Sequence, residues 1–188
     1  MLPGQGESTL QVRAAHEDVA LASTLTTAVF QSTDNNTADI YLTDLPIEAF
    51  TTPGDLRQYA GSIVHIHLFF VSRWGRTPVD AAACNFAMRH AVVTGGEAAG
   101  VYAGGGFLFS DEPRGSRFTG SVRDATVRLL RADPAFADRL SESGAALVSG
   151  TISARRDEAL ARAIAGKFER LVATLPVISD PAGGEGAE

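Results

Sequence analysis

The sequence predicts an α+β protein: an antiparallel sheet of five or six strands, built from hairpins, with C-terminal helices packed on one face. Segments rich in β-branched and aromatic residues follow one another through residues 23–110, with links of hairpin length. The strongest helical periodicity lies near the C-terminus, at residues 157–175. Strands and helices therefore do not alternate as they would in parallel βαβ units.

Length and composition indicate one folded domain. The chain has 188 residues, of which 45% are hydrophobic and 20% are charged, as in ordinary globular proteins. We place the domain at residues 23–176, between a peripheral segment at 1–22 and a disordered tail at 177–188. The net charge of -6 argues against a protein that neutralises nucleic-acid phosphates, so nucleic acid is not an expected partner.

The compartment is left open by the sequence. The longest apolar stretch, residues 63–71, is far shorter than the ~20 residues of a membrane-spanning helix, so we expect a soluble protein without a transmembrane segment. The start of the chain lacks the basic and apolar regions of a signal peptide. We expect a cytoplasmic protein, or an exported one whose signal peptide has been removed.

The first elements are a hairpin and a short helix. Residues 23–33 and 37–45 are rich in strand-forming residues, and the turn-forming sequence between them predicts a hairpin. Residues 51–61 carry a possible cap at Thr52 and a proline suited to the first helical position, which predicts a short helix. Residues 62–71 are apolar on both faces and predict a central strand.

The middle of the chain predicts a second hairpin. The sequence at 77–84 repeats the same capping pattern and predicts one helical turn inside a loop. Residues 85–94 and 100–110 then predict two antiparallel strands joined by the short link 95–98. The glycines of the second strand indicate a bulge, or the close approach of a helix, a ligand or another backbone. We favour close packing against the C-terminal helix over ligand binding.

The last third predicts further helices around one strand. In residues 121–133, a capping-box relation between Ser121 and Asp124 and apolar positions on one side predict a helix. Pro134 should end it and open a short second helix. Residues 145–154 predict a strand, and the periodic segment 157–175 predicts the final helix.

Two histidines on the central strand suggest a metal site. His65 and His67 are separated by one residue, so their side chains project from the same face. With His90 on the next strand, they could bind zinc with an open fourth position. This layout resembles the zinc ligands of α-carbonic anhydrases in these three residues alone, and it implies a metal-dependent hydrolase or lyase.

The alternative is that these histidines bind no metal. His90 shares its strand face with Phe86 and Met88, which are expected in the core, so we expect no cofactor, with zinc as the alternative. Alternation along the central strand places its aliphatic side, including Val64 and Ile66, toward the helices. The face with His65 and His67 would then lie away from the helices.

Two loops hold the candidate binding residues. Arginine and tryptophan are enriched at binding hot spots, and the loops carry Arg73, Trp74, Arg76, Arg114 and Arg117. The favoured function is a non-catalytic binding domain that contacts a protein partner or a small anionic ligand through these loops, possibly as a homo-oligomer. No diagnostic catalytic motif is present, so enzymatic activity stays open as the less favoured alternative. Only one of the 16 basic residues is a lysine, a skew to which we assign no function.

Overall fold

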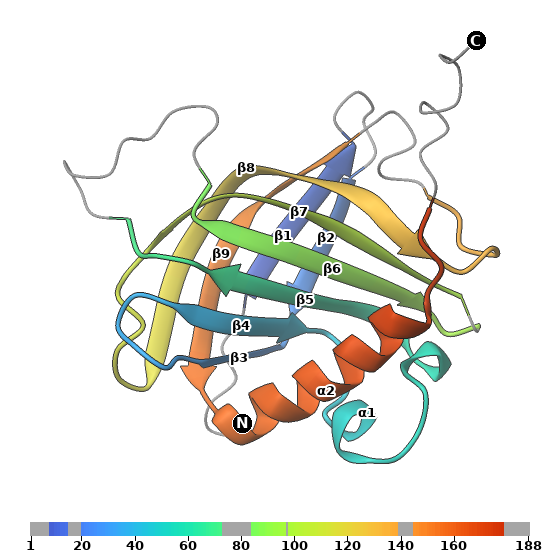
Figure 1. Cartoon of the computed structure of the whole chain (residues 1–188), viewed down its shortest axis with the longest axis horizontal. Coiled ribbons are helices and arrows are strands. Elements are labelled where there is room, and N and C mark those ends of the chain that lie inside the picture. The colour runs from blue at the N-terminus through green and yellow to red at the C-terminus, as the bar shows by residue number, and fades with distance from the viewer. Residues whose placement is uncertain (1–7, 15–19, 73–83, 97, 139–144, 179–188) are drawn as a thin grey trace, which may run out of the picture.

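The structure, a computed structural model, describes residues 8–14, 20–72, 84–96, 98–138 and 145–178. In these ranges the chain forms nine strands, two α-helices and one 3-10 helix (Figure 1). The strands are β1 (Ser8–Ala14), β2 (Ala20–Leu25), β3 (Thr27–Gln31), β4 (Ala38–Thr43), β5 (Ala60–Leu68), β6 (Phe86–Thr94), β7 (Ala99–Ser110), β8 (Arg117–Ala132) and β9 (Ala146–Arg156). The helices are α1 (Glu48–Thr51), the 3-10 helix η1 (Leu56–Gln58) and α2 (Glu158–Thr174).

The sheet closes on itself. Strands β3 to β8 pair with their neighbours in sequence order, and every one of these pairs is antiparallel. β9 pairs antiparallel with β8 along one edge, and its end pairs in parallel with β3 through Val29–Arg155 and Phe30–Arg156. The first half of β9 also pairs with β1, which in turn pairs with β2. The α+β class is confirmed, and the sheet is larger than the five or six strands predicted.

Closure gives the sheet an inward and an outward face. Inward side chains from all the strands around the ring form one apolar cluster, in which Phe30, Ile66, Leu108 and Phe118 are almost completely buried. A second cluster joins the outward face of β3 to β7 to the helices. Figure 1 shows α2 lying across the outside of the sheet with α1 beside it. Part of the segment expected at the periphery belongs to the first cluster, because Leu10 and Val12 of β1 are buried in it.

The final helix follows its prediction. The Asp157 side chain caps α2 by accepting a hydrogen bond from the backbone N–H of Leu160 at 3.0 Å. Ile164, Phe168 and Leu171 repeat at helical spacing, and all three are buried against the outward face of the sheet. No helix in the described ranges is long and apolar enough to cross a membrane.

The predicted helix at 121–133 is wrong, because these residues belong to β8. The β8–β9 register shifts between Val122 and Ala125, where Asp124 has a positive φ of 48°. The bulge inserts an extra residue, so Val122 and Ala125 are both buried although they are three positions apart. In the sequence, apolar residues three positions apart are also typical of one face of a helix. Residues 134–138 are not helical either.

The short helices also differ from their predictions. Residues 51–61 contain the last residue of α1, the 3-10 turn η1 and the start of β5. The Asp55 side chain, rather than Thr52, caps η1 by accepting a hydrogen bond from the Arg57 backbone N–H at 2.9 Å. The helical turn predicted at 77–84 lies almost wholly outside the described residues. Both hairpins, β3–β4 and β6–β7, are confirmed.

The three successive glycines of β7, Gly104 to Gly106, pack against strands rather than against α2. A Cβ atom on Gly104 would lie 1.9 Å from the Thr126 carbonyl oxygen of β8, and one on Gly105 would lie 2.5 Å from the Phe86 carbonyl oxygen of β6. The β7–β8 register shifts between Gly105 and Phe107, as expected of a bulge. These glycines therefore let three strands approach closely.

Candidate functional site

A carboxylate joins the two neighbouring histidines on the outward face. Asp39 of β4 lies directly opposite His67 of β5 and diagonally from His65. Its Oδ1 atom is 2.8 Å from His67 Nδ1 and 3.0 Å from His65 Nε2. The hydrogen bond from His65 is the main cause that lowers the pKa of Asp39 to about 2. Asp39 is therefore ionised at neutral pH and accepts from both rings.

A residue of the neighbouring strand forms a hydrogen bond with the second ring nitrogen of His65. Arg89 of β6 lies opposite His65, and its Nη2 atom is 3.0 Å from His65 Nδ1. Arg89 also binds both carboxylate oxygens of Glu169 on α2, with Nη1 3.1 Å from Oε2. This pairing lowers the pKa of Glu169. Since arginine only donates, His65 accepts at Nδ1 and donates from Nε2 to Asp39.

The third predicted zinc ligand lies on the other face of the sheet. His90 pairs with Val64 and Tyr102, is 3% exposed and belongs to the inward side. The three histidines therefore do not converge. Among the described residues, no group of three or more His, Cys, Asp or Glu side chains could hold a metal ion. The predicted orientation of β5 is also wrong, because Val64 and Ile66 point inward while His65 faces α2.

The inward position of His90 has an electrostatic consequence. Neither of its ring nitrogens has a hydrogen-bond partner in the described part of the chain. Burial without a partner lowers the pKa of His90 to about 4, so the ring is neutral at neutral pH.

His67 opens onto a cleft beside the first turns of α2. We call this cavity of about 350 Å³ the histidine cleft. The side chain of His67 is 45% exposed, and Nε2 has no hydrogen-bond partner within the described residues. Glu158 pairs with Arg156, whereas Arg162 has no carboxylate partner among them. The lining residues are Gln31, Ser32, Thr33, Thr37, Ala38, Asp39, His67, Glu158 and Arg162.

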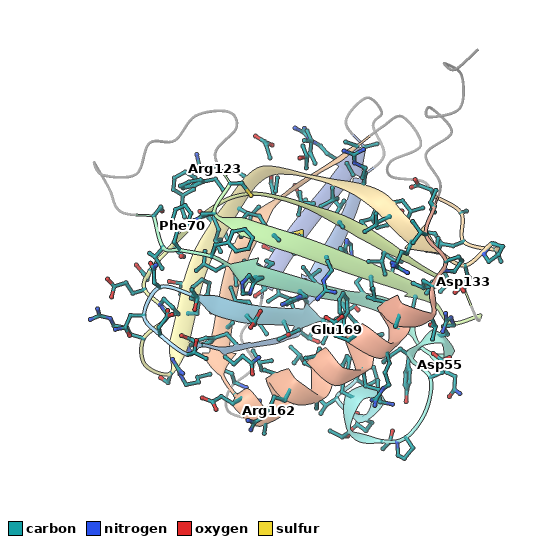
Figure 2. All side chains as sticks on the ribbon, in the orientation of Figure 1. Asp55, Phe70, Arg123, Asp133, Arg162 and Glu169 are labelled. Atoms are coloured by element: carbon teal, nitrogen blue, oxygen red, sulfur yellow. The ribbon has the colours of Figure 1, made fainter. Side chains whose placement is uncertain are left out.

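A second cleft lies near the other end of α2. We call this cavity of about 290 Å³ the lysine cleft. Figure 2 shows Arg162 and Asp55, one residue from each cleft, at opposite ends of the helix. The lining residues of the lysine cleft are Gly54, Asp55, Leu56, Arg57, Lys167, Arg170, Leu171 and Thr174.

Arg57 is held in place and its charge is balanced. Its Nε donates to Asp133 at 2.9 Å, Nη1 donates to Asp55 at 3.3 Å, and Nη2 donates to Thr174 at 3.0 Å. The hydrogen bond to Asp133 is the main cause that raises the pKa of Arg57. Arg57 therefore has a fixed position in the wall of the lysine cleft, and its positive charge is neutralised by Asp55 and Asp133.

Lys167 is buried without such a balance. The residue is 8% exposed, and its Nζ donates to the Gly54 carbonyl oxygen at 2.6 Å. No carboxylate in the described ranges forms an ion pair with this ammonium group, or with the exposed Arg170 beside it. Gly54 has a φ of +146°, which favours glycine, so the turn that presents its carbonyl to Lys167 depends on this residue.

The predicted loop residues do not gather at these clefts. Arg114 is exposed and pairs with Glu112, and Arg117 is exposed at the start of β8. Neither lines the histidine or the lysine cleft. Arg73, Trp74 and Arg76 lie outside the described residues. A binding role for these five residues stays a prediction.

Sequence reasoning missed the groups that line the two clefts. Asp39 gave no local signal, since its partnership with His67 depends on the β4–β5 register. Lys167 did give a signal, because it is the only lysine in the chain and falls on the buried face of a periodic helix. Comparisons of the chain with models of protein families, with curated proteins and with solved structures give no match.

Proposed function

We propose that the protein is a binding domain for a small anionic ligand, and that the lysine cleft holds the anion. The observation that supports this most directly is the buried ammonium group of Lys167, which has one backbone carbonyl and no carboxylate as its partner in the described residues. A buried charge is unfavourable unless it is paired and hydrogen-bonded. A carboxylate or phosphate group in the cleft would supply the missing charge.

The surroundings of Lys167 favour a small ligand with one anionic group. Arg170 adds a second cation without a carboxylate partner in the described part of the chain, while Leu56 and Leu171 offer apolar surface. The volume of about 290 Å³ is at the lower end of the usual range for small-molecule sites. Because the protein as a whole carries a net charge of -6, attraction of an anion depends on this local arrangement.

The test is calorimetric titration of the purified protein with inorganic phosphate and with citrate. We expect saturable binding of at least one of these anions, and an increase in melting temperature with anion concentration. Lys167→Met should abolish the binding while it leaves the melting temperature of the free protein unchanged or raises it, since a buried ion is replaced by an apolar chain. Lys167→Arg should retain part of the binding.

The matched control is Arg128→Gln, which removes an exposed positive charge on β8, away from both clefts. We expect this variant to bind the anion as the wild type does. If Lys167→Met folds and binds with unchanged affinity, or if the wild type binds neither anion, the proposal is wrong.

A further inference from the structure

The histidine cleft carries an inference that does not rest on the anion-binding proposal. Asp39 Oδ1 lies 2.8 Å from His67 Nδ1, so Nδ1 carries the proton and Nε2 presents its lone pair. That lone pair belongs to a half-exposed ring in the cleft wall. A carboxylate that orients an imidazole in this way is a common arrangement for proton transfer in enzymes.

Two features keep Asp39 suited to this role. The His65 Nε2 atom donates to the same Oδ1 at 3.0 Å, so the carboxylate is held from two sides. Its pKa, lowered to about 2, keeps it ionised, and it can stabilise the positive charge that His67 would acquire with a second proton. Arg89 in turn holds His65 through Nδ1.

The other wall of the cleft suggests the substrate. Arg162 has no carboxylate partner among the described residues, and a guanidinium group binds a carboxylate with two parallel hydrogen bonds. A general base without a metal can activate water against an ester more readily than against an amide, whose amine leaving group must be protonated. The cleft volume of about 350 Å³ suits a small molecule.

We propose that Asp39, His67 and Arg162 form a general-base site that hydrolyses small esters bearing a carboxylate. Water attacks the acyl carbon and forms a new C–O bond while His67 Nε2 takes the proton of the water. The bond to the leaving oxygen then breaks, the electron pair stays on that oxygen, and the protonated imidazole returns the proton to it. The products are a carboxylic acid and an alcohol, and His67 is neutral again.

The test uses two chromogenic probes, neutral 4-nitrophenyl acetate and the anionic mono-4-nitrophenyl ester of succinic acid. The wild type should release nitrophenolate from the anionic ester faster than free imidazole does at the same concentration. His67→Gln should lower kcat by about 100-fold or more, in line with the contribution of a general base. Asp39→Asn, which disturbs the tautomer of His67, should lower kcat and leave KM nearly unchanged.

Arg162→Gln provides a second test. Because Arg162 is exposed on α2, we expect the variant to fold as the wild type does. It should raise KM for the anionic ester far more than KM for the neutral ester, while Arg128→Gln should change neither. Three results would each overturn the proposal. They are a wild-type rate no higher than that of free imidazole, full activity in folded His67→Gln, and a stable acyl group on His67 in the mass spectrum.

Discussion

The two clefts at the ends of α2 differ in how their charges are satisfied. In the histidine cleft, the Asp39 carboxylate accepts hydrogen bonds from two imidazoles, so this anionic group already has its partners within the protein. In the lysine cleft, the Lys167 ammonium group donates to one carbonyl and has no carboxylate partner in the described residues. The Asp39 carboxylate therefore needs no partner from solution, and we propose that it orients His67 for proton transfer. The lysine cleft is incomplete and calls for an anion from solution.

The largest predicted effect concerns a buried side chain of α2, the helix that contributes residues to both clefts. Phe168 is fully buried beneath α2, with its ring centroid 6.1 Å from that of His65 and 5.0 Å from the Arg89 guanidinium carbon. Phe168→Ala should reduce the free energy of unfolding by roughly 3 to 5 kcal/mol, because it leaves a cavity between helix and sheet. Urea denaturation measures this change.

Phe168→Ala should also weaken phosphate binding and ester hydrolysis together, since both clefts depend on the seating of α2. A loss of stability below about 1 kcal/mol would show that the helix does not rely on this ring. Loss of phosphate binding with intact ester hydrolysis, or the reverse, would show that the two clefts do not both depend on the packing of Phe168.

A smaller predicted effect is the loss of stability at low pH, which should occur in different pH ranges for His90 and for Asp39 of the histidine cleft. The folded-state pKa of His90 is about 4, below its ordinary 6.5. As the pH falls from 6.5 to 4, the unfolded chain binds a proton that the folded protein does not. Stability should therefore fall over that window by up to about 1.4 kcal/mol per pH unit. For Asp39, the pKa of about 2 lies below the ordinary 3.8, so its contribution should be complete above pH 3.8 and lost between pH 3.8 and 2.

Urea denaturation of His90→Leu from pH 7 down to pH 2 tests this separation. The variant should lose the decline between pH 6.5 and 4, because an apolar side chain fits the inward cluster and binds no proton. The decline below pH 3.8 should remain, since the Asp39 pairing is intact. An unchanged slope between pH 6.5 and 4 in the variant would show that His90 does not titrate in this way.

Local patterns were sufficient for the elements whose signals are local. The hairpin β3–β4 has turn-forming residues between two strand-like runs, and α2 has a capping residue and an unbroken apolar period. β8 was mistaken for a helix because its bulge at Asp124 imitates helical spacing. Closure of the sheet gave no local signal, since it joins Val29 to Arg155 across most of the chain.

The same distinction holds for the clefts. The common face of His65 and His67 follows from strand alternation, so it was predictable. Their shared partner Asp39 depends on the register between β4 and β5, and the cleft depends on where α2 crosses the sheet. The placement of His90 on the inward face was expected from Phe86 and Met88, which share it. The turn at Gly54 that meets Lys167 lies 113 positions away from it along the chain, beyond any local pattern.

The single lysine makes the central claim directly measurable. When lysine nitrogen is isotope-labelled, the side-chain ammonium signal in a nuclear magnetic resonance spectrum can come only from Lys167. We predict that this signal shifts in a saturable way when the anion that binds in calorimetry, phosphate or citrate, is added, and that the shift follows the calorimetric binding curve. A signal that stays unchanged while the anion binds elsewhere would contradict the assignment of the lysine cleft as the anion site.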